Sequence, residues 1–128
     1  LKACYSPRYF ARTHTNSMEK LTAVADVLRT HQMVDLIDPG LIDTEILKKL
    51  HNPEYVEAFL SGESAFATIQ GFKPWNEQLR DAILSVQAGQ LLGAKIALKE
   101  GIAANIAHLL LGEGAAIGAV ADFRHRLR

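Results

Sequence analysis

The side chains of this 128-residue sequence that could hold a metal or move a proton are scattered along the chain. A metal site needs ligands that converge at a fixed distance, which on one helix means residues three or four positions apart. No two of the five histidines have that spacing; they are His14, His31, His51, His108 and His125. The spacing therefore assigns no metal ligand. We expect His51 to be structural, and His108, beside an apolar run, to be a satisfied core or surface residue.

Cys4 is the only cysteine, so an internal disulfide is excluded and the chain is suited to a reducing compartment. Because Cys4 falls in a short apolar strand pattern, we interpret it as an inert buried thiol rather than a nucleophile. Four acidic residues could supply paired carboxylates, but each stands where a turn, a cap or a first helical turn already accounts for it. They are Asp38, Asp43, Glu45 and Glu54.

Two further segments carry residue types that are often functional. Gly112-Glu113-Gly114 follows an apolar run, but it lacks both the Gly-x-Gly-x-x-Gly pattern and the Walker lysine, so we interpret it as a turn. The segment 61–74 is a long loop for a compact domain. The aromatic residues in and around it would pack either on the core or in an interface with another copy. These residues are Phe59, Phe66, Phe72 and Trp75.

The elements that must position these residues alternate between strand and helix patterns, which favours an α/β fold in layers. Strands are predicted at 2–5, at 34–37, and from Ile102 into the following apolar run. Helices are predicted from Asn16 or Ser17 onward, at 44–50, at 53–60, at 76–100 and at Gly112–Phe123. We therefore expect a small three-layer domain spanning 1–128, with a short parallel sheet of about three strands and flanking helices.

The predicted helix limits rest on capping chemistry. The capping residues are Asn16 with Glu19, Asn52 before Pro53, and the closing glycines Gly62 and Gly101. Within the longest helix, Gly89 and Gly93 each lower helix stability by about 1 kcal/mol relative to alanine. Glycines inside a long helix indicate that a larger side chain would not fit, which predicts close packing of this helix against another element.

Three segments occur in the order and rough spacing of a known family. They are Tyr5-Ser6-Pro7-Arg8-Tyr9 with His14-Thr15-Asn16-Ser17-Met18-Glu19-Lys20, then Leu50-His51-Asn52-Pro53-Glu54-Tyr55-Val56, then Asn76 to Gly101 with Ile102-Ala103-Ala104-Asn105. Through them, Leu1 to about Asn105 resembles the N-terminal part of the histone deacetylase and acetoin-utilisation protein superfamily. Ser17 replaces that family's usual proline. The resemblance implies the truncated start of the arginase/deacetylase fold, with His51 belonging to its scaffold.

The same resemblance implies that a Gly-Gly-x-His-His stretch should follow, with its two histidines acting as general acid and base on a zinc-bound water. An ungapped count instead places Leu111 and Gly112 there, and neither side chain can transfer a proton. The family's zinc ligands and its carbonyl-polarising tyrosine would lie farther along. Residues 106–128 depart from the pattern, so no catalytic, cofactor-binding or metal-binding residue is assigned.

The hydrophobic content and net charge of the sequence argue against nucleic acid and membranes as partners. Hydrophobic residues make up 48% of the sequence and the formal net charge is zero, which is typical of a globular domain without a strong field for nucleic acid or anionic membranes. Three arginines near the end, at positions 124, 126 and 128, are interpreted as a solvated tail. No signal-peptide pattern or membrane-spanning run is present, and we expect a cytoplasmic location.

Two functions of different class remain. The first is a non-catalytic, deacetylase-like α/β domain without a cofactor, which forms a homodimer or other homo-oligomer or binds a partner. The alternative is one part of a zinc-dependent deacetylase acting on acetyl-lysine, acetylpolyamine or a similar amide, completed by a complementary protein chain. For the chain alone, the missing residues favour no enzymatic activity.

Overall fold

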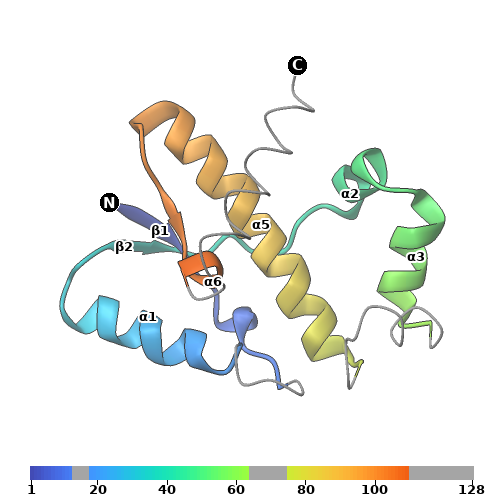
Figure 1. The fold of residues 1–128 in the computed structure, drawn as a ribbon, viewed down its shortest axis with the longest axis horizontal. Helices are drawn as coiled ribbons and strands as arrows, with labels where there is room; N and C mark the ends of the chain where they lie inside the picture. Colours follow the sequence, from blue (N-terminus) through green and yellow to red (C-terminus); the bar gives the residue numbers. More distant parts are fainter. Residues whose placement is uncertain (13–17, 64–74, 110–128) are drawn as a thin grey trace.

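The computed structural model describes residues 1–12, 18–63 and 75–109, which form a small α/β domain (Figure 1). Its centre is a parallel three-stranded sheet in the order β2-β1-β3. The strands are β1 (Lys2–Cys4), β2 (Asp35–Ile37) and β3 (Ala104–Asn105). The expected parallel sheet of three strands is confirmed.

The pairing register divides the side chains of the sheet between two faces. Ala3 pairs with Leu36 and Ala104, and Cys4 pairs with Ile37 and Asn105. Because side chains alternate along a strand, each set of three shares one face.

Helix α1 (Lys20–Thr30) covers the Ala3 face of the sheet. Its Leu21 and Ala25 are buried in one cluster with Ala3, and Val24 and Leu28 pack against that cluster. Residues 21, 24, 25 and 28 therefore form the apolar face through which α1 packs on the sheet. The short helix α6 (Ile106–Leu109) completes this layer, since its first residue is buried in the same cluster.

Helix α5 (Glu77–Glu100) covers the Cys4 face. Asn76 caps its start by accepting the Leu79 N–H at 2.8 Å, and Gly101 ends it at a φ of 91°. The prediction for this helix is confirmed at both ends. Ser85 of α5 is buried and donates to the Gly40 carbonyl at 2.7 Å, which holds the turn after β2 against the helix.

Helices α2 (Thr44–Leu50) and α3 (Pro53–Ser61) contact each other beside α5 (Figure 1). Asp43 and Asn52 cap them, and Gly62 closes α3 at a φ of 71°, in the left-handed region that favours glycine. These elements agree with the predicted ranges. None of the helices within the described ranges is both long and apolar enough to cross a bilayer.

The third strand is present, but its predicted bounds are wrong. Ile102, its proposed start, is 65% exposed, and the strand ends at Asn105. The physical reason lies in its neighbour: β1 stops at Cys4 and turns into the 3₁₀ helix η1 (Pro7–Tyr9), so β3 has no pairing partner farther along. The apolar residues that follow begin a helix instead, which buries Ile106 against α1.

The start of the first helix also differs from the prediction. α1 begins at Lys20, with Glu19 at its N-cap making no side-chain cap bond. The residues proposed to cap it, Asn16 and Ser17, lie outside the described residues, as does the helix predicted at Gly112–Phe123. The turn η1 was not predicted; Ser6 caps it by accepting the Arg8 N–H at 3.2 Å.

Candidate functional site

A buried polar network lies where β3 meets α5. The Tyr9 hydroxyl donates to Asn105 Oδ1 at 2.8 Å, and Asn105 Nδ2 donates to the Val86 carbonyl at 3.1 Å and to Gln90 Oε1 at 3.0 Å. Tyr9 is 0% exposed and Asn105 is 6% exposed. Each polar atom of the Asn105 amide therefore has a partner inside the protein, as a buried amide requires.

Gly89 of α5 provides the space for this network. A Cβ atom at this position would overlap the Tyr9 hydroxyl and would lie 3.0 Å from both terminal atoms of Asn105. At Gly93, one turn later, a Cβ would lie 3.8 Å from the Ala104 carbonyl oxygen and 4.0 Å from Cys4 Sγ, which are ordinary contacts. The close packing predicted at these glycines is confirmed, and it is much tighter at Gly89.

The network borders a groove of about 450 Å³ between α2 and α5. Most of its walls are apolar, and Ala103, Ala104 and Asn105 contribute to it from β3 and the residue before it. The apolar side chains along the two helices and before α2 include Ile42, Ile46, Leu47, Leu91, Ala94 and Leu98. A few polar groups also line it, among them His51, Gln87 and Gln90. Its volume is within the usual range of ligand sites, about 300–1,000 Å³.

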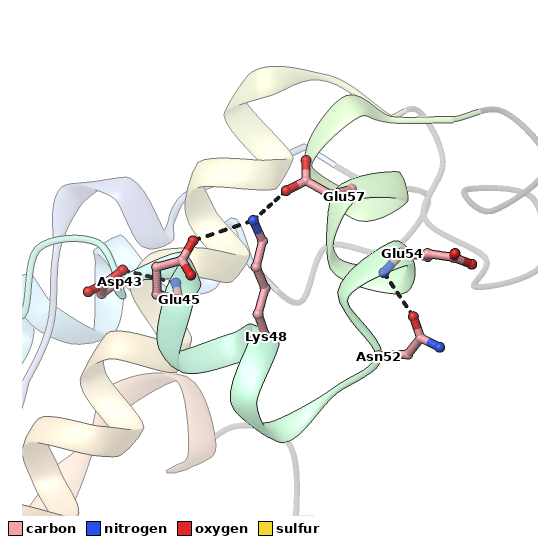
Figure 2. Close-up of polar contacts among 6 residues, drawn as sticks. All are labelled: Asp43, Glu45, Lys48, Asn52, Glu54 and Glu57. Atoms are coloured by element: carbon pink, nitrogen blue, oxygen red, sulfur yellow. Dashed lines mark hydrogen bonds and ion pairs between the residues drawn. The ribbon is translucent and has the colours of Figure 1, made fainter.

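The acidic candidates beside the groove have structural roles (Figure 2). Asp43 accepts the Glu45 N–H at 2.9 Å at the start of α2. Lys48 forms ion pairs with Glu57 at 2.5 Å and with Glu45 at 3.4 Å, joining α2 to α3. The hydrogen bond to Glu57 is the largest cause that raises the pKa of Lys48, and the hydrogen bond to Glu45 acts in the same direction.

The other two acidic candidates also lie at a cap and a turn. Glu54 is in the first turn of α3, where its N–H donates to the Asn52 side chain at 2.8 Å (Figure 2). Asp38 accepts the Gly40 N–H at 2.9 Å in the turn after β2. These placements match the interpretation of the four acidic residues as turn, cap and first-turn residues, and they bring no two carboxylates together as an acid and base pair.

The histidines are not brought together by the fold. His51 ends α2, is exposed, and stacks on Tyr55 with ring centroids 5.9 Å apart, while His31 ends α1 on a different part of the surface. Within residues 1–12, 18–63 and 75–109, no three His, Cys, Asp or Glu side chains could hold a metal ion together. His14, His125 and the side chain of His108 lie outside this description.

Cys4 is fully buried on the α5 face of the sheet. Burial raises the pKa of its thiol, which lowers the fraction of the reactive thiolate at neutral pH. The structure therefore supports the interpretation of Cys4 as a packing residue. The glycines at 112–114, Leu111 and the arginines at 124, 126 and 128 lie outside the described residues.

Two of the four aromatic candidates pack within the chain. Phe59 meets Trp75 edge to face with ring centroids 4.9 Å apart, and Trp75 also packs against the buried cluster that contains Leu79. Phe66 and Phe72 lie outside the described residues. Packing within the chain is therefore observed for Phe59 and Trp75, which help to attach α3 to the start of α5, and an interface with another copy stays a prediction.

Burial of Cys4 and Tyr9 predicts an alkaline loss of stability. Burial is the main cause that raises the pKa of each group, from 9.0 for the thiol and from 10.0 for the phenol, so the folded chain retains protons that the unfolded chain releases. The stabilisation is complete below the unfolded pKa values and is lost as the pH rises above them. We expect the urea midpoint of unfolding to fall steadily above about pH 9.

A Cys4→Ala variant provides the control for this prediction. It removes the group that titrates first, so its urea midpoint should begin to fall at a higher pH than that of the wild type. A wild-type midpoint that stays constant through about pH 10.5 would contradict the assigned burial.

Sequence reasoning missed the Tyr9–Asn105 network. One available signal was the amide of Asn105, which interrupts the apolar run predicted as the third strand, since a buried amide must find partners. Comparison of the full sequence with protein-family models and with curated proteins finds no match in either.

Proposed function

We propose that this chain is a non-catalytic α/β domain that acts by self-association, and that its architecture is that of the opening part of the arginase/deacetylase fold. The observation that carries the proposal is the sheet itself. Helices α1 and α5 cover the two faces of this sheet, but the sheet has only three described strands, and its edge strands β2 and β3 have only three and two residues. Association with a second copy would cover an edge of this small sheet and the apolar side chains beside it.

Exposed apolar side chains give further support. Leu98 is 82% exposed, Met33 is 62% exposed, and Ile102 at the entry to β3 is exposed as well. The chain has no net charge, so two copies would not repel each other through a long-range field. The polar residues of the candidate site hydrogen-bond to one another, which favours a structural over a catalytic role for Tyr9, Asn105 and Gln90.

Thermal unfolding tests this proposal. Association of folded chains stabilises them by mass action, so the midpoint temperature should rise as the protein concentration is raised. Circular dichroism melts at low and high micromolar concentration would measure the shift. A midpoint that is independent of concentration, in a chain that unfolds cooperatively, would count against self-association.

The alternative is that the chain is one part of a zinc-dependent deacetylase completed by another polypeptide. The position of Asn105 favours it, because ligand sites of parallel α/β sheets gather beyond the carboxyl ends of the strands. The described residues do not fit a zinc site, so the ligands would come from elsewhere. Under this alternative, the isolated chain should not hydrolyse a fluorogenic acetyl-lysine substrate, and a chain bearing His-His and Asp-x-His motifs should restore hydrolysis. Failure of every such chain to restore it would remove this alternative.

A further inference from the structure

We infer that the groove between α2 and α5 is the surface through which two copies of the chain associate, each inserting Leu98 and Ile102 into the groove of the other. This inference rests on the proposed self-association and specifies its site. It commits to a second copy as the occupant, in a two-fold arrangement in which the same patch serves on both chains.

The groove and the residues that would fill it belong to one continuous surface. Leu98 lines the groove near the end of α5 and is 82% exposed, and Ile102 lies between two residues, Gly101 and Ala103, that line it as well. Leu98 and Ile102 form a ridge beside the groove, so the same patch can be complementary to itself. In a two-fold dimer, the ridge of each copy would then be buried in the groove of the other.

The inner polar groups of the groove argue against a small polar ligand as its occupant. Asn105 donates to Gln90 Oε1 and accepts from the Tyr9 hydroxyl, so these groups already have partners before anything binds. The wall opposite, along α2, presents Ile46 and Leu47. A surface of this kind fits aliphatic side chains.

Charges around the groove fit the same arrangement. The segment 43–63, which contains α2 and α3, holds five carboxylates against two lysines, and Lys48 is shared by two of the carboxylates. Next to Leu98, α5 carries the exposed Lys95 and Lys99, while the nearby Glu100 is already paired with Lys2. Inserting the end of α5 from one copy against α2 and α3 of the other brings these opposite charges together twice, which favours this orientation.

The test is the self-association of the full chain carrying Leu98→Glu, compared with Val27→Glu. Val27 is also an exposed aliphatic residue, at 55%, but it lies on α1, on the other face of the sheet. Sedimentation equilibrium should show a dimer dissociation constant raised about tenfold or more by Leu98→Glu and by less than about threefold by Val27→Glu. Circular dichroism would verify that both variants fold like the wild type.

The possible outcomes distinguish the groove as the interface from self-association in general. A monomeric wild-type chain would overturn both. A dimeric wild type whose dissociation constant is unchanged by Leu98→Glu, or raised equally by the two substitutions, would overturn the groove as the interface and leave self-association standing. Loss of dimer in Val27→Glu alone would likewise overturn it, and would place the interface on α1.

Discussion

Replacing Gly89 by alanine should lower the free energy of unfolding by about 2–4 kcal/mol. The added Cβ would overlap the buried Tyr9 hydroxyl and crowd the Asn105 amide, so the Tyr9–Asn105 hydrogen bond must lengthen or break. This cost exceeds the gain of about 1 kcal/mol in intrinsic helix stability that alanine brings in place of glycine. Urea unfolding followed by circular dichroism would measure the difference.

Gly93→Ala is the matched control, since it makes the same chemical change one turn later in α5. Its Cβ would make only ordinary contacts with the Ala104 carbonyl and Cys4 Sγ, so the helix gain should dominate and raise the free energy of unfolding by about 0.5–1 kcal/mol. Equal effects of the two substitutions, with the same sign, would contradict the packing described at Gly89.

The second large effect is expected at Asn105. Asn105→Leu removes three hydrogen bonds and leaves the buried Tyr9 hydroxyl without its acceptor, which should lower the free energy of unfolding by about 2–4 kcal/mol. Adding Tyr9→Phe removes the stranded hydroxyl, because replacing both partners of a buried hydrogen bond by apolar groups costs less than replacing one. The double variant should therefore be more stable than the sum of the two single effects predicts.

A double-mutant cycle measures this coupling directly. We expect an interaction free energy of about 1–2 kcal/mol between positions 9 and 105, measured from urea unfolding of the wild type, the two single variants and the double variant. The cycle of Tyr9→Phe with Val27→Ala is a suitable comparison, because Val27 is 55% exposed on α1 and takes no part in the Tyr9–Asn105 network. Additive effects at positions 9 and 105 would show that the hydroxyl and the amide do not act together.

The sequence predicts the helices best where capping residues coincide with apolar periodicity. Four predicted helix ends agree with the structure. They are marked by Asn52 before Pro53, by Asn76 before the longest helix, and by the closing glycines Gly62 and Gly101. These signals are local, since a side-chain cap or a left-handed backbone needs only neighbouring residues. The strands at 2–5 and 34–37 were also placed to within a residue.

The third strand could not be placed in the same way, because its length depends on a distant partner. Nothing between Ile102 and Ile106 indicates that β1 has only three residues, yet that length decides where pairing ends. The change from strand to helix at Ile106 is a tertiary effect, in which burial against α1 overrides a pattern that fits either element.

The candidate site was harder to predict than the fold. The residues singled out for chemistry in the sequence were charged or metal-binding types, whereas the fold brings together a tyrosine, an asparagine and a glutamine separated by up to 96 positions. The groove likewise depends on how α2 approaches α5, which no single segment encodes. Gly89 pointed to close packing in this region through its cost to the longest helix, but it did not indicate which residues it would meet.

The most direct test of the proposed function is the molecular mass of the folded wild-type chain in solution, measured by sedimentation equilibrium across the micromolar range. Self-association through a two-fold interface predicts a mass that approaches twice the 14.1 kDa of the chain as the concentration rises. A mass that remains at 14.1 kDa throughout, with the circular dichroism of a folded α/β domain, would contradict the account.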